Sequence, residues 1–168
     1  MNRFAFVLGA IALVFTAACS RQKEITTLQR KEAANLASEA QFAMSLRDLP
    51  RTEGLLKKAA ELCPDTGEYW VNLGSVRMRL KDRSGAKAAY KSGLSAYEAA
   101  YKKDSKDKDL LLRQVYILAL LGDVKKARSI LEDAQKKNPD DRLIQGFVRS
   151  KQLDAMLADP DFRQLALQ

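Results

Sequence analysis

The chain has 168 residues, a formal net charge of +8 at pH 7, two cysteines and no histidine. Without histidine it cannot form histidine-dependent catalytic triads or histidine metal sites, and two separated cysteines provide no zinc site. The length is sufficient for one compact domain.

Residues 1–18 have the pattern of an export signal. Arg3 provides a positive start, residues 4–18 carry no charge, and small residues lead up to Cys19. As a helix this apolar stretch would rise only about 22 Å, less than the roughly 30 Å hydrocarbon core of a bilayer. The pattern therefore predicts a signal peptide over residues 1–18 and not a membrane span.

The residues at the cleavage point, Thr16-Ala17-Ala18-Cys19, resemble the lipobox of bacterial lipoprotein precursors. In that family the cysteine becomes the first residue of the mature chain and carries covalent lipid. The resemblance implies a lipid anchor at Cys19, a short tether over residues 19–27 and, because Ser20 follows the cysteine, sorting to the outer membrane facing the periplasm. The same small residues also fit an ordinary secretory cleavage site, which would leave Cys19 unmodified.

The second cysteine, Cys63, lies at helical spacing from Ala59 and Ala60. If Cys19 carries lipid, Cys63 has no intramolecular partner and the exported chain folds without a disulfide. We interpret Cys63 as a small buried thiol, since free cysteine usually packs as a small hydrophobe. An intermolecular or redox role is the alternative.

After the tether the sequence predicts helices only, because alanine, leucine, lysine and glutamate recur at spacings of three and four and strict strand alternation is absent. Helix is expected from near Thr27. The predicted turns include residues 47–50, with Pro50 at a helix start. They also include residues 81–85, with Ser84 as a helix cap, and residues 65–68, where Asp65 opens a start that resembles a capping box.

Six residues within 67–100 stand at the fixed offsets of a known repeat motif: Trp70, Leu73, Gly74, Ala86, Tyr90 and Gly93. This pattern resembles the tetratricopeptide repeat, in which tryptophan, leucine and glycine on one helix are followed by alanine, an aromatic and a small residue on the next. The small residues have a physical reason, because they allow the two helices to approach closely.

Two further segments fall in register with this repeat. Residues 33–66 precede it by one period, and residues 108–141 follow it with Ala127, Ala134 and Pro139 at matching offsets. The last offset is longer by seven residues, which we assign to an insertion at 101–107. We expect the insertion to lengthen the second helix of the middle repeat and to form an exposed loop.

The resemblance implies an all-α fold. It predicts a right-handed helix-turn-helix solenoid of about three repeats within residues 28–141. Residues 142–168 are expected to form capping helices, because the last hydrophobic face of a repeat array is otherwise exposed. A short final helix is predicted to start at Asp159-Pro160.

In tetratricopeptide proteins the first helices of successive repeats line a concave groove that binds protein partners. Transferring the positions of that groove to this sequence predicts a lining of Gln41, Met44, Asn72, Ser75, Arg79, Leu112, Arg113 and Tyr116. This lining mixes hydrogen-bonding groups with two guanidiniums and favours an extended segment with some negative charge.

No catalytic, cofactor-binding or metal-binding residues are predicted, apart from the lipid expected on Cys19. The resemblances imply a membrane-anchored adaptor or assembly factor of the bacterial cell envelope, serving pilus, secretion or cell-wall machinery. The alternative is a structural envelope protein that associates with anionic wall or membrane through its basic charge. Nucleic acid is not expected as a partner, and the oligomeric state is open, with Tyr97 and Tyr101 able to make a dimer contact or to pack on the third repeat.

Overall fold

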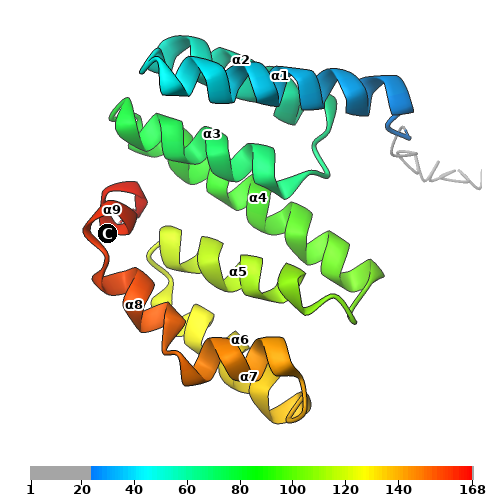
Figure 1. Cartoon of the computed structure of the whole chain (residues 1–168), viewed down its shortest axis with the longest axis vertical. Helices are drawn as coiled ribbons and strands as arrows, with labels where there is room; N and C mark the ends of the chain where they lie inside the picture. The colour runs from blue at the N-terminus through cyan, green and yellow to red at the C-terminus, as the bar shows by residue number, and fades with distance from the viewer. Residues whose placement is uncertain (1–23, 168) are drawn as a thin grey trace, which may run out of the picture.

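The computed structural model of the protein describes residues 24–167. This part of the chain contains nine α-helices and no strand, packed in chain order as a solenoid of helix pairs (Figure 1), which confirms the predicted fold class. The predicted signal peptide and Cys19 lie outside the described residues. The helices are α1 (Thr27–Ser45), α2 (Leu49–Leu62), α3 (Gly67–Arg79), α4 (Arg83–Lys103), α5 (Lys108–Leu120), α6 (Val124–Lys137), α7 (Arg142–Arg149), α8 (Gln152–Ala158) and α9 (Pro160–Leu165).

Three antiparallel pairs, α1/α2, α3/α4 and α5/α6, stack along the long axis of the molecule (Figure 1). The odd-numbered helices of these pairs form one layer, and α2, α4 and α6 form the layer behind it. None of the described helices combines the length and the apolar character needed to span a bilayer.

Side-chain caps define several helix starts. Thr26 and Gln29 form a reciprocal capping box at the start of α1. Asp48 accepts a hydrogen bond from the Arg51 N–H at the start of α2, where Pro50 occupies the first turn. Both arrangements satisfy backbone N–H groups that have no partner inside the helix.

Two predicted caps were wrong. α4 is capped by Asp82, whose carboxylate accepts from the Gly85 N–H at 2.8 Å, so Ser84 lies inside the helix. Asp65 does not cap α3, because its carboxylate is held by the Arg30 guanidinium of α1, with the shorter contact at 2.7 Å. The residue that precedes α3, Thr66, makes no side-chain cap bond.

The small residues of the middle repeat bring α3 and α4 together. A Cβ atom on Gly74 would lie 2.4 Å from the ring of Tyr90, and a Cβ atom on Gly93 would lie 3.2 Å from the Gly67 carbonyl oxygen. Trp70 at the start of α3 is half-buried, and its Nε1 donates to the Pro64 carbonyl at 3.0 Å. The repeat signature is therefore a set of packing contacts.

The insertion lengthens α4, which has 21 residues against 14 in α2 and in α6. Its last turns extend past the neighbouring helices before the exposed loop at 104–107 (Figure 1). Tyr97 is buried and Tyr101 is half-buried, and both pack with side chains of α5 in one cluster. These two tyrosines therefore pack on the third repeat.

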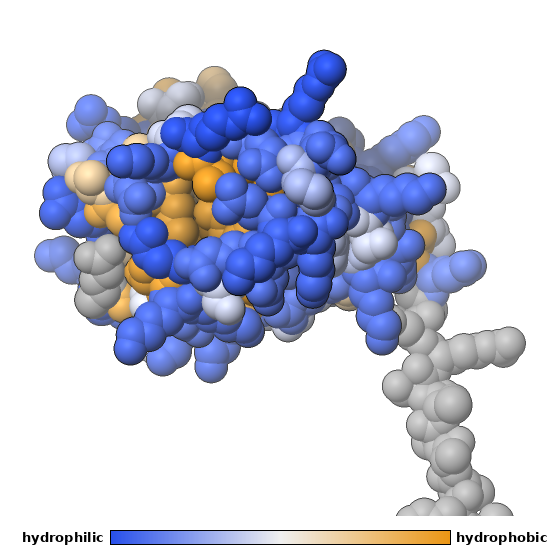
Figure 2. Space-filling view, turned by 90° about the horizontal axis from the view of Figure 1, so that it is seen from below, coloured by the Kyte–Doolittle hydropathy of each residue, from blue (hydrophilic) through white to orange (hydrophobic). Residues whose placement is uncertain are grey.

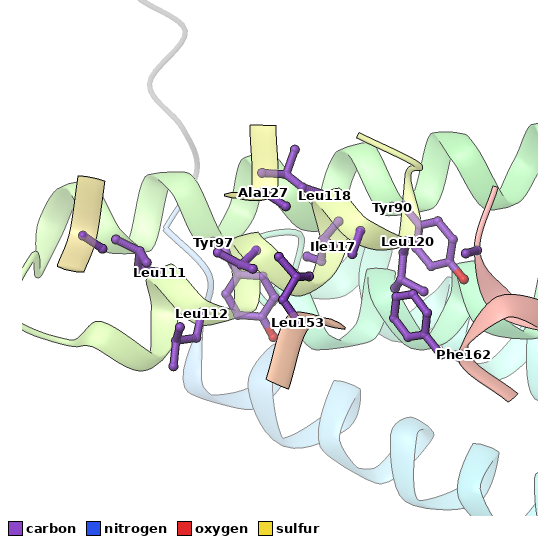
Figure 3. Packing of buried hydrophobic residues seen from close by; sticks show 14 of the residues in the cluster. Tyr90, Tyr97, Leu111, Leu112, Ile117, Leu118, Leu120, Ala127, Leu153 and Phe162 are labelled. Carbon is purple, nitrogen blue, oxygen red and sulfur yellow. The ribbon is translucent and has the colours of Figure 1, made fainter. Parts of the chain in front are cut away.

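The largest hydrophobic cluster spans α3 to the C-terminal segment and is centred on α5, which buries eight of its residues. Figure 3 shows Tyr90, Leu120 and Phe162 grouped at one end of this cluster and Tyr97 and Leu111 toward the other. Two smaller clusters join α1, α2 and α3, and one of them also includes Ala89 of α4. The other contains Cys63, which is 1% exposed with its Sγ 3.7 Å from the Gln29 carbonyl oxygen, so it packs as the predicted small buried thiol.

The C-terminal segment is more than a cap on the last pair. The chain breaks at Lys151, whose φ of 50° is left-handed, so residues 142–158 form two helices. α7 packs on α6 and α5, where a cap is expected, whereas α8 and α9 turn back over α5 and α9 reaches α3. The turn back is stabilised by burial of Phe162 and by a 2.7 Å hydrogen bond from the Leu167 N–H to the Leu120 carbonyl.

Candidate protein-binding surface

The first helices of the three pairs line two neighbouring cavities. The α1–α3 cavity has a volume of about 520 Å³, and six of the eight predicted groove residues line it. The α5–α7 cavity has a volume of about 710 Å³ and is lined by Leu112, Arg113 and Tyr116 together with residues of α7 and α8. The structure thus brings the predicted residues to one side of the array, with Tyr116 shared by both cavities. The six residues in the α1–α3 cavity are Gln41, Met44, Asn72, Ser75, Arg79 and Tyr116.

The α1–α3 cavity combines an apolar base with free polar groups. Leu56 and Val76 are buried at its base. Within residues 24–167 the side-chain amides of Gln41 and Asn72 make no hydrogen bond. Arg79 forms no ion pair in this part of the chain, and its guanidinium donates only a long hydrogen bond to Met44 Sδ at 3.9 Å. Two amides and one cation are therefore available to a ligand.

Ser75 is held by the fold. Its hydroxyl donates to the Val71 carbonyl at 3.0 Å and lies 3.4 Å from the hydroxyl of Tyr90. Tyr90 in turn donates to the Leu165 carbonyl at 2.9 Å, and burial raises the pKa of this tyrosine to about 12. The neutral phenol links α4 to the C-terminal segment. The Ser75 hydroxyl is part of this hydrogen-bond network and is therefore not a free group for a ligand.

Arg113 is also engaged within the chain. Its Nε lies 2.6 Å from an Asp109 carboxylate oxygen, and its guanidinium stands 5.6 Å from the centre of the Tyr97 ring. The hydrogen bond with Asp109 raises the pKa of Arg113. Of the two guanidiniums predicted for the groove, only Arg79 is free of such partners in the described part of the chain.

The C-terminal helices cover part of the predicted groove. The ring of Tyr116 meets that of Phe162 edge to face, with centroids 5.6 Å apart, and burial raises the pKa of Tyr116. Leu112, predicted as groove lining, is only 8% exposed and forms the base of the α5–α7 cavity. Leu165 reaches the edge of the α1–α3 cavity. The chain's own C-terminal segment therefore contributes to the lining of both cavities, which the prediction did not include.

The prediction missed the residues that α7 and α8 contribute to the α5–α7 cavity. Leu143, Phe147 and Met156 supply apolar surface, and Arg142 supplies a positive charge. Leu143 is 48% exposed, and this end of the array shows an apolar area between hydrophilic residues when viewed from below (Figure 2). The four-residue spacing of Leu143 and Phe147 indicated a helix face, but not that α8 would fold back to form a wall beside it.

Among the described residues, no group of three or more cysteine, aspartate or glutamate side chains is arranged to hold a metal ion.

The fold and the surface can be compared with known proteins. A tetratricopeptide repeat family model matches residues 86–150. The match supports tetratricopeptide repeats. It covers α5, α6 and α7 together with most of α4, whereas the first helix pair and α3, with Trp70, Leu73 and Gly74, lie outside it. No curated protein matches the chain in sequence. Because arrays of such repeats generally offer extended surfaces to other proteins, the match supports a protein-binding role.

Proposed function

We propose that the protein is a membrane-anchored, non-catalytic adaptor of the bacterial cell envelope that holds a segment of a partner protein in the α1–α3 cavity. The observation that carries the proposal is the set of free groups around that cavity, namely the amides of Gln41 and Asn72 and the guanidinium of Arg79. Amides pair with the backbone of an extended chain, and a guanidinium favours a carboxylate.

The anchor is the acylated Cys19, and the expected location is the outer membrane, facing the periplasm. This part of the proposal is supported by the sequence pattern of residues 1–19. From Cys19 to the start of α1 at Thr27 an extended chain spans at most about 30 Å, so the repeats would lie close to the bilayer. A protein held there is suited to assembling pili, secretion channels or cell-wall enzymes.

The segment that fits the cavity has an acidic side chain and one apolar side chain. The carboxylate would pair with Arg79, and the apolar side chain would rest over Leu56 and Val76. Burial of a leucine-sized side chain would contribute about 2 kcal/mol to binding.

Crosslinking in intact cells, followed by mass spectrometry of the proteins captured by the full-length chain, tests the proposal. Joint replacement of Gln41, Asn72 and Arg79 by alanine should reduce capture of an envelope protein at least tenfold, because it removes three free groups, each worth about 1 kcal/mol. The thermal melt should be unchanged, since none of the three has a side-chain hydrogen bond or ion pair inside the described fold beyond the weak contact of Arg79 with Met44.

The matched control is Arg149→Ala, which removes an exposed guanidinium from α7 and should leave capture intact. Undiminished capture by the triple variant would contradict the assignment of the cavity. Capture of wall or membrane material alone, released by moderate salt, would favour the alternative of a structural envelope protein that binds anionic surfaces through its basic charge. Cys19→Ala tests the anchor separately, because loss of acylation should release the protein from the membrane fraction.

A further inference from the structure

The outer face of α1 carries an unusual amount of exposed apolar surface. Three of the four large hydrophobic side chains that are strongly exposed in the described residues belong to this helix or to its C-cap: Leu28 at 74%, Phe42 at 61% and the C-cap residue Leu46 at 62%. Leu28 and Phe42 are two heptads apart, and Leu46 follows Leu28 by five helical turns. The three side chains therefore share one stripe, about 27 Å long at 1.5 Å per residue.

Nothing else in the described chain covers this stripe. The buried side of α1 is made of Ala33, Ala40 and Ala43, and it faces α2 and the rest of the array. The outer face of α1 is the position that the second helix of a preceding repeat would take. Terminal repeats usually present a polar outer face to water, so the apolar stripe is a departure that needs a partner.

Polar residues interrupt the stripe at regular places. Asn35 stands midway between Leu28 and Phe42, one heptad from each, and Lys31 and Glu39 stand four residues before and after Asn35. All three are exposed, and within the described residues none of them forms an ion pair or a side-chain hydrogen bond. A bilayer would desolvate Glu39 and Asn35 without offering them a partner, which makes a lipid surface a poor occupant.

We propose that the occupant is a second copy of this chain, packed through the outer face of α1 in an antiparallel arrangement about a two-fold axis at Asn35. Residue positions that add up to the same sum then face each other. Leu28 lies against Phe42 of the second copy, Lys31 pairs with Glu39 of the second copy, and the two Asn35 amides meet on the axis. Each of the off-axis contacts occurs twice, as two-fold symmetry requires.

The pairing uses every interrupting residue. The two charges are opposite in sign and equidistant from Asn35, which is the requirement for self-complementarity in an antiparallel helix pair. The amide pair on the two-fold axis fixes the register, as buried asparagine does in coiled coils. Leu46 extends the stripe by one turn beyond the contact of Phe42 with Leu28 of the second copy.

The expected dimer is weak in solution. One helix face on each side buries less than the roughly 1,200 Å² typical of stable protein–protein interfaces. If the proposed lipid anchor holds both copies on one membrane, their effective concentration rises and the pairing becomes populated. The rise in effective concentration rests on the proposed function, whereas the pairing itself does not.

Disulfide trapping of the full-length protein tests the axis. Asn35→Cys places two thiols next to each other on the two-fold axis, so mild oxidation should produce a covalent dimer. Ser129→Cys is the control, because it places an exposed thiol on α6, far from α1. Buried Cys63 should not react. A disulfide dimer of the unsubstituted chain would show that Cys19 is a free thiol. That result would contradict the lipid anchor but not the pairing of α1, so the trapping is repeated in the Cys19→Ala background.

Charge reversal tests the register. Lys31→Glu or Glu39→Lys should each lower the yield of the trapped dimer about tenfold, since each change sets like charges together at two places in the dimer. The double variant, Lys31→Glu with Glu39→Lys, should restore the yield. Phe42→Ser should lower it as well, whereas Leu143→Ser, at the exposed leucine of α7, should not.

Two results would overturn the proposal. The first is a trapping rate for Asn35→Cys no greater than for Ser129→Cys, and the second is a double charge reversal that fails to restore the dimer. Retention of the Cys19→Ala chain by phosphatidylglycerol vesicles, lost in Phe42→Ser, would assign the outer face of α1 to a lipid surface instead.

Discussion

The contact between Gly74 and Tyr90 joins three segments of the chain. The tyrosine ring lies against the backbone of α3 where glycine has no side chain, and its hydroxyl donates to the Leu165 carbonyl. The ring is fully buried, so it has little room to move away from an added atom. The absence of a side chain at position 74 therefore allows the close contact through which Tyr90 links α3, α4 and the C-terminal segment.

Gly74→Ala should lower the free energy of unfolding by about 2 kcal/mol, because the new Cβ would lie 2.4 Å from a ring atom of Tyr90. Urea denaturation monitored by circular dichroism measures this. Gly54→Ala is the matched control, since nothing lies within 4 Å of a Cβ at that position of α2 and alanine is the better helix former, so it should raise stability by up to about 1 kcal/mol. Equal effects of the two substitutions would contradict the packing argument.

The C-terminal helix α9 is short, yet it links the third repeat to the second. Phe162 is 7% exposed and meets the Tyr116 ring, and the Leu167 N–H reaches the Leu120 carbonyl at the end of α5. A helix of six residues is not stable by itself, so its position depends on this burial. The same burial places Leu165 at the edge of the α1–α3 cavity.

Phe162→Ala should release α9 and destabilise the protein by about 3 kcal/mol, the cost of removing a buried aromatic side chain. Amide exchange measured by mass spectrometry should show residues 159–167 losing protection while α1 and α2 keep theirs. Phe42→Ala removes the same side chain from an exposed position and should change stability by less than about 0.5 kcal/mol. Retained protection of α9 in Phe162→Ala would show that its hydrogen bonds suffice.

Along the whole molecule, contacts run mainly between consecutive helices, and the return of α8 and α9 is the main exception. Stability in such an array is a sum of local terms, so its two ends need not unfold together. The N-terminal end has the weaker packing, because α1 buries three alanines whereas α5 buries eight residues, most of them larger than alanine.

At low micromolar concentration, where the α1 face is free, the amides of α1 and α2 should exchange faster than those of α3 to α5. The expected difference in opening free energy is about 2 kcal/mol, since fewer apolar atoms leave water when α1 packs. Hydrogen exchange with peptide-level mass spectrometry resolves the two regions. Uniform protection along the array would mean that the chain opens as one cooperative unit.

What the sequence determined about this protein is local. Helix periodicity and turn residues predicted the helix pairs, and the spacing from Trp70 to Gly93 predicted their close packing, because a repeat contacts mainly its neighbours. Local rules could also mislead: Ser84 is a good capping residue, but Asp82 stood two residues earlier in position to accept from the Gly85 N–H.

Only the tertiary structure decided which surface residues are engaged within the chain and which remain exposed. The break at Lys151 and the return of α9 depend on burial of Phe162 against Tyr116, a contact between residues 46 positions apart that no spacing rule contains. Asp65 pairs with Arg30 instead of capping α3, and Arg113 contacts Asp109 and Tyr97 instead of remaining free in the groove. Charged groups interact most strongly with the partners that lie nearest in space, and sequence spacing alone does not give those distances. For the same reason, only the packed array distinguishes Leu28 and Phe42, which face water, from residues of equal hydrophobicity in its core.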